Sequence, residues 1–231
     1  MALIKARAAS SDAVTRVAEG TEVYIKALRD GTLTTAAFFQ ALAMEGKMFM
    51  ANAGTVTTPI TFGAGSIDST EPDLYVAVYS GNAIIPVSIS ILMEAYGTNA
   101  IFETMASFGT DGTTFTGAGG AVVTPANLKI GGGKSSIYAY GGTNASSLTY
   151  FSNPREIFRN GQQVAITKAT AVNNIANLDS PTGYKFTWSA VSSGIMPVLI
   201  GPAQLCVYAA AQASTGFISF CYVELPASAL V

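Results

Sequence analysis

The feature of this sequence that most restricts its fold is an alternation that begins after Gly46. Short runs of β-branched and aromatic residues are separated by clusters of Gly, Asn, Asp, Pro and Ser. Such runs are typical of β-strands bounded by turns. They do not alternate with helical segments, so a parallel α/β sheet is not expected. The sequence therefore predicts an all-β domain, an antiparallel sandwich of two sheets, with a jelly roll as the topology that suits the length and covers the sheet edges.

The chain divides into an N-terminal arm, residues 1–20, and one β-sandwich domain, residues 21–231. A Gly- and Thr-rich stretch around residues 109–134 is predicted to be a long loop or an excursion from the domain. One short N-terminal helix is predicted over residues 34–46, TTAAFFQALAMEG, because Thr34 or Thr35 can cap its start and Gly46 can close its end in a left-handed conformation.

The remaining segments with β-strand character are bounded by local turn signals. Asn153-Pro154 and Asn160-Gly161 are strong turn signals of this kind, and they predict a short strand between them. Strands are expected near residues 21–29, 47–51, 56–62, 74–79, 84–95, 100–108, 135–140, 148–151, 156–158, 164–169, 184–191, 196–200, 204–210 and 216–225.

Charged residues are scarce, at 11% of the chain against roughly 25% in an ordinary soluble domain. A surface with so little charge is usually covered by another molecule. Residues 186–223 contain no charged residue, but Pro and Gly interrupt them repeatedly, so we expect short buried strands there and no transmembrane span. No apolar run of signal-peptide length opens the chain, and the net charge of −2 predicts little direct binding of nucleic acid.

Side chains that carry most enzyme chemistry are missing. The chain has no histidine, which excludes histidine-based triads, histidine general bases and every metal site that needs histidine. Two cysteines cannot build a four-cysteine zinc or iron–sulfur site. We therefore expect a protein that is not an enzyme, without catalytic or cofactor-binding residues.

Two groups of carboxylates are the metal candidates. Asp68, Glu71 and Asp73 in DSTEPD could hold Ca²⁺ at a subunit interface if carbonyl groups or a neighbouring subunit completed the ligands, although we favour an ordinary solvated loop. Glu94 and Glu103 flank Gly97-Thr98-Asn99. A two-residue loop would place these glutamates opposite each other, where they could share a proton, bind a cation or hydrolyse a glycoside. A three-residue loop, which we favour, separates them.

Cys206 and Cys221 lie on the last two predicted strands. A hairpin centred between Ala213 and Ser214 would bring them within disulfide reach, but without a signal peptide we expect two reduced, buried thiols. The segment 131–136, GGGKSS, departs from a phosphate-binding loop because Leu128 stands where that motif needs glycine and a strand follows instead of a helix. We expect a flexible glycine loop.

Two segments carry a resemblance to a known family. PDLYVAVYSGNAIIPVSISILMEAYGTNAIFETMASFGT resembles the early strands of viral single jelly-roll capsid proteins, such as those of bacteriophages and environmental viruses, and GPAQLCVYAAAQASTGFISFCYVELP resembles the closing strands. The resemblance spans roughly Thr55 to Pro226 and is one of texture and strand order. It implies a virion structural protein, assembled in the host cytoplasm into a homo-oligomeric shell, with other virion proteins as further partners. The N-terminal arm departs from the pattern because it is not dense in Arg and Lys.

The alternative function is a carbohydrate-binding or adhesive β-sandwich, such as a virion spike or a surface lectin. Aromatic platforms for a sugar could come from Tyr24, Tyr79, Tyr96, Tyr138, Tyr140, Tyr150 and Trp188. The same aromatic residues also suit the core of a β-sandwich.

Overall fold

The computed structural model describes residues 38–63, 66–95, 101–110, 121–142, 152–163, 184–210 and 214–230. The predicted N-terminal arm and the strands predicted at 21–29, 148–151 and 164–169 lie outside these residues. The described chain folds into two antiparallel sheets with a common core, which confirms the prediction of an all-β fold with two antiparallel sheets.

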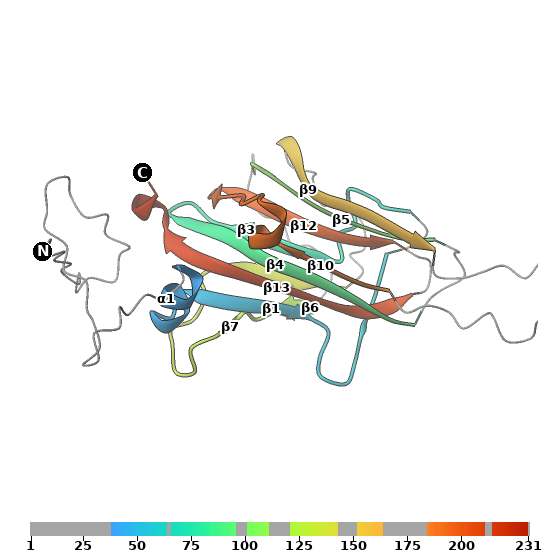
Figure 1. The fold of residues 1–231 in the computed structure, drawn as a ribbon, viewed down its shortest axis with the longest axis horizontal. Helices are drawn as coiled ribbons and strands as arrows, with labels where there is room; N and C mark the ends of the chain where they lie inside the picture. The colour runs from blue at the N-terminus through green and yellow to red at the C-terminus, as the bar shows by residue number, and fades with distance from the viewer. Residues whose placement is uncertain are drawn as a thin grey trace, which may run out of the picture.

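One sheet has seven strands and the other has six. Figure 1 shows the two sheets as layers of the molecule. The seven-stranded sheet contains β1 (Met48–Ala53), β2 (Ile60–Thr61), β4 (Asn82–Ala95), β7 (Ala126–Asn127), β10 (Lys185–Ser189), β11 (Leu199–Ile200) and β13 (Thr215–Pro226). The six-stranded sheet contains β3 (Leu74–Val78), β5 (Ile101–Thr110), β6 (Ala121–Val123), β8 (Tyr138–Gly141), β9 (Ser152–Gln163) and β12 (Ala203–Ala210). The helical elements are α1 (Phe38–Met44), α2 (Ala190–Ser193) and the 3-10 helix η1 (Ala227–Ala229).

Eight of these strands are at least five residues long, and they pair in a nested order. Taken in chain order, the first pairs with the eighth (β1 with β13) and the second with the seventh (β3 with β12). The third pairs with the sixth (β4 with β10) and the fourth with the fifth (β5 with β9). The first and third pairs join through β4 and β13, and the second and fourth join through β5 and β12. The eight strands thus form two antiparallel layers, with β1, β4, β10 and β13 in one layer and β3, β5, β9 and β12 in the other.

Alternation along the strands builds the core between the layers. In β1, Phe49, Ala51 and Ala53 belong to the core cluster, whereas Asn52 on the opposite face is exposed. The ring of Phe49 stacks on Tyr222 of β13 at a centroid distance of 5.8 Å. Contacts of this kind hold the first and last strands together, although they are far apart in the sequence.

Helix α1 covers part of the outer face of the seven-stranded sheet. Its Leu42 is 3% exposed and packs in a cluster with Val223 and Leu225 of β13, and Leu230 after η1 packs against the same cluster. Figure 1 shows α1 and η1 at the same end of the molecule. Gly46 follows α1 with a φ of 74°, a conformation that glycine adopts without strain. With seven and four residues, the two α-helices of the described chain are too short to cross a membrane.

Two local predictions are wrong. The turn signals at Asn153-Pro154 and Asn160-Gly161 lie inside the single strand β9, whose pairing with β5 overrides them. β9 forms the outer edge of its sheet and bonds to β5 on one side only. Pro154, which has no backbone N–H, is tolerated on such an edge. The excursion around 109–134 is also more than a loop, since β6 and β7 lie within it and extend the two sheets.

Candidate functional site

Glu94 and Glu103 do not lie opposite each other, so the pair that a two-residue loop would have formed is not present. Glu94 lies near the end of β4 in the seven-stranded sheet, whereas Glu103 lies on β5 in the six-stranded sheet. Because β4 and β5 belong to different sheets, they do not form a hairpin of either loop length. Glu103 instead lies opposite Gly161 of β9 and Ala210 of β12. These two carboxylates therefore do not form a shared acid pair.

Asp73 is a structural residue and does not belong to a solvated loop. Its side chain is 1% exposed, and its two carboxylate oxygens accept hydrogen bonds from the backbone N–H groups of Gly63 (2.8 Å) and Ala209 (2.6 Å). Burial raises the pKa of Asp73 to about 8, and the two N–H donors offset only part of this rise. The carboxyl group thus joins the start of β3 to the end of β12.

The other two members of DSTEPD lie outside this buried site. The Asp68 carboxylate is exposed and accepts hydrogen bonds from the backbone N–H and the hydroxyl group of Thr70, and these bonds lower its pKa. Glu71 is half-buried, and its charge adds to the rise in the pKa of Asp73. Within the described ranges, no three Asp, Glu, Cys or His side chains are grouped closely enough to hold a metal ion.

The two cysteines are buried thiols on different sheets. Cys206 of β12 pairs in register with Tyr75 and Ser107, and Cys221 of β13 lies opposite Met50 and Ser88. The predicted hairpin between their strands is wrong, because β12 and β13 belong to opposite layers. Both thiols are free, as predicted, and burial raises the pKa of Cys206 to about 12.

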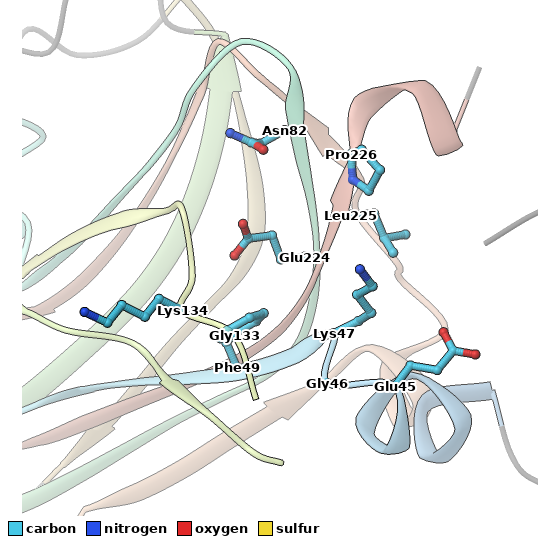
Figure 2. Close-up of a pocket in the computed structure, with 10 residues that line it drawn as sticks. All are labelled: Glu45, Gly46, Lys47, Phe49, Asn82, Gly133, Lys134, Glu224, Leu225 and Pro226. Carbon is cyan, nitrogen blue, oxygen red and sulfur yellow. The ribbon is translucent and has the colours of Figure 1, made fainter. Parts of the chain in front are cut away.

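The glycine-rich segment 131–136 is anchored by a carboxylate of the chain itself. Glu224 accepts hydrogen bonds from the Ser135 hydroxyl (2.6 Å), from the Ser136 backbone N–H (3.0 Å) and from the Ser136 hydroxyl. A pocket of about 340 Å³ opens beside Glu224 (Figure 2). Its charged lining residues are two lysines and two glutamates, so the lining has no excess charge of either sign for an ionic ligand: Glu45, Lys47, Lys134 and Glu224.

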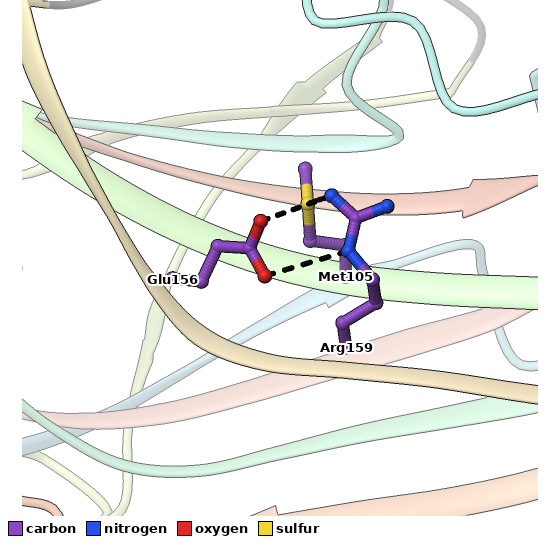
Figure 3. Close-up of polar contacts among 3 residues, drawn as sticks. All are labelled: Met105, Glu156 and Arg159. Carbon is purple, nitrogen blue, oxygen red and sulfur yellow. Dashed lines mark hydrogen bonds and ion pairs between the residues drawn. The ribbon is translucent and has the colours of Figure 1, made fainter.

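The outer edge of the six-stranded sheet is polar. Arg159 of β9 forms an ion pair with Glu156 at 3.0 Å, and its Nη2 lies 2.9 Å from the Sδ atom of Met105 (Figure 3). Arg155 on the same strand is exposed. These side chains lie along one edge strand, and the charge of Arg159 is paired with that of Glu156.

The edge of the seven-stranded sheet that β10 and β11 form is apolar. After β10, the chain forms α2 and β11 and continues along β4. This stretch exposes five large aliphatic side chains, with exposed fractions between 46% and 68%, which we call the apolar edge segment: Val191, Ile195, Met196, Val198 and Ile200. We expected buried strands here. The absence of charge between residues 186 and 223 was the sequence signal for this surface, but it did not indicate which side chains face outward.

The aromatic residues considered for sugar binding separate into two groups. Trp188 is 5% exposed and belongs to the core, and Tyr140 is partly buried. Tyr79 and Tyr138 are exposed, and their rings meet edge to face at a centroid distance of 5.2 Å. Tyr24, Tyr96 and Tyr150 lie outside the described residues.

Comparisons with protein-family models, with curated proteins and with solved structures found no match for this chain.

Proposed function

We propose that this chain is a virion structural protein that self-assembles into a capsid shell through its β-sandwich domain. The observation that carries the proposal is the apolar edge segment, where five large aliphatic side chains face outward within a stretch that has no charge. Several large apolar side chains exposed in one short stretch mark an interaction site in a folded protein. A shell of identical copies in the virion would cover it.

The nested strand pairing supports a jelly roll. A jelly roll is a double-sheet antiparallel fold of eight strands, and viral capsid domains and lectins use it. Here the eight longer strands pair first with last, second with seventh, third with sixth and fourth with fifth. The shorter strands β6, β7 and β8 are then insertions between the fourth and fifth strands of the roll. Helix α1, which lies ahead of β1, is the short N-terminal helix of the proposed domain.

The free energy gained by burying the apolar edge segment is comparable with the cost of association. Complete burial of one large aliphatic side chain contributes about 1.5–3 kcal/mol. The five side chains are each about half exposed, so their burial contributes about 4–8 kcal/mol per copy, and twice that in a contact between two such surfaces. Association costs about 4–15 kcal/mol in lost freedom. A single contact is therefore weak, and a closed shell that repeats the contact becomes stable.

The second candidate function is a carbohydrate-binding or adhesive β-sandwich. The observation that favours it is the exposed pair of Tyr79 and Tyr138, since tyrosine rings bind the apolar faces of sugars. Their edge-to-face geometry, with an interplanar angle of 88°, gives no flat two-ring platform. A glycan array, with and without Ca²⁺, tests this function, and Tyr138→Ala should abolish any signal that the pair produces.

The test of the shell proposal is the particle mass of the full-length chain. We expect sedimentation velocity to show large particles above a threshold protein concentration, and negative-stain electron microscopy to show them as closed shells. Because the proposed contact is apolar, sulfate salts should favour assembly and moderate concentrations of NaCl should not dissolve the particles. A chain that stays monomeric at every concentration and salt condition would refute the proposal.

A further inference from the structure

We infer that one edge of the sandwich, the apolar edge segment, is the surface through which one copy of this chain contacts a second copy, and that the edge strand β9 is protected from such pairing. The inference rests on the proposed function and names the surface that performs it. It follows from a comparison of the two edges, because Phe158 of β9 and Phe186 of β10 pack at a centroid distance of 4.7 Å, which places β9 and β10 on the same side of the sandwich.

The backbone of β9 is unsuited to pairing with another strand, although β9 is the longest edge strand in the described part of the chain. Asn153 has a φ of 52°, Pro154 has no N–H to donate, and the pairing with β5 shifts register in two places. Each of these features interrupts the regular row of hydrogen-bonding groups that strand addition needs.

The side chains of β9 oppose the same kind of contact. The ion pair of Arg159 and Glu156 leaves both side chains about half exposed, and Arg155 is exposed nearby. Inward-lying or edge-lying charges of this kind keep sheet edges apart, since pairing would remove them from water. A contact between copies is therefore directed away from β9.

The apolar edge segment presents aliphatic side chains on short elements. β10 has only five residues, α2 then turns the chain, and β11 pairs with β4 over only two residues. A contact at this edge therefore uses the exposed aliphatic side chains. Four of the five lie within six residues, between Ile195 and Ile200, so they are neighbours along one short segment, which we call the patch.

The absence of charged residues around the patch in the sequence indicates which kind of partner it contacts. A nucleic acid or a charged protein needs charges of the opposite sign, and residues 186–223 contain none. A second copy presents the same uncharged surface, so a twofold contact places no like charges opposite each other and buries apolar surface on both sides. The second copy is therefore the occupant that the chemistry of the patch fits.

The experiment compares single lysine substitutions in the full-length chain. Val198→Lys and Met196→Lys introduce a charge into the patch, at side chains that are 46% and 47% exposed. Leu128→Lys is the matched control, because Leu128 is 44% exposed but lies after β7, outside the patch. Circular dichroism should show the same fold for all three, since surface substitutions seldom unfold a domain.

Sedimentation velocity should show that the concentration needed for assembly rises more than about tenfold in the two patch variants, because each contact would bury two added charges. The control should assemble as the unmodified chain does. Normal assembly of both patch variants would overturn the assignment of this edge and leave the shell proposal standing. Equal loss of assembly in the control would also overturn the assignment. It would likewise be overturned if the monomer bound phosphatidylcholine vesicles and Val198→Lys abolished that binding. An unmodified chain that never assembles would instead refute the proposed function.

Discussion

The pH dependence of unfolding should reveal the buried carboxyl group of Asp73. Burial raises the pKa of Asp73 to about 8 in the folded chain, whereas the ordinary value is 3.8. Between pH 5 and pH 7 the group is therefore protonated in the folded state and ionised in the unfolded state. A group with a raised pKa contributes stability that is complete below its unfolded pKa and is lost as the pH rises through its folded pKa. Asp73 should thus lower the free energy of unfolding as the pH rises.

The size of this effect follows from the number of protons exchanged. A difference of one bound proton between the two states changes the free energy of unfolding by about 1.4 kcal/mol per pH unit. From pH 5 to pH 7, the contribution of Asp73 should therefore fall by about 3 kcal/mol. The chain has no histidine, so the side chains that usually titrate in this range do not contribute.

The assay is urea unfolding of the unmodified chain and of Asp73→Asn at pH 5, 6 and 7, at one protein concentration. The amide places an NH₂ group against one of the two backbone donors, Gly63 or Ala209, and this costs about 1–3 kcal/mol at every pH. The difference between the two curves should therefore change with pH by the amount derived above. Asp68→Asn is the control, because the pKa of the exposed Asp68 is lowered and its effect is confined to acid pH. Parallel curves for the unmodified chain and Asp73→Asn would refute the reasoning.

Three further predictions concern particular contacts. Glu224→Ala should lower the free energy of unfolding by about 1–2 kcal/mol in urea titrations, because it removes the acceptor of the serine donors in the glycine-rich segment. Gly216→Ala should lower the free energy of unfolding by about 3 kcal/mol or more, since a Cβ atom there would overlap the Leu92 carbonyl oxygen. Gly133→Ala, with nothing within 4 Å, should change it by less than about 0.5 kcal/mol. Cys206 and Cys221 should react with a thiol reagent far faster after unfolding than before, and a disulfide on mild oxidation of the folded chain would contradict their placement on opposite sheets.

The local pattern of the sequence was sufficient to locate most strands that the structure describes. β3, β4, β12 and β13 lie close to their predicted ranges, because alternation and β-branched content are properties of neighbouring residues. The same information placed both thiols in the interior. It failed at β9, where turn signals at Asn153 and Asn160 were overridden by hydrogen bonds to β5, a partner that lies more than forty residues earlier in the chain.

Which strands pair is a property of the tertiary structure, because consecutive strands such as β4 and β5, or β12 and β13, pass to opposite sheets. Turn residues show where a chain reverses, but the partner of each strand is selected by packing against residues distant in the sequence. That choice separated Glu94 from Glu103 and buried Asp73. The scarcity of charge is visible in the sequence. The outward direction of the apolar edge segment depends on the pairing of β11 with β4 and on the packing of the core on the inner face.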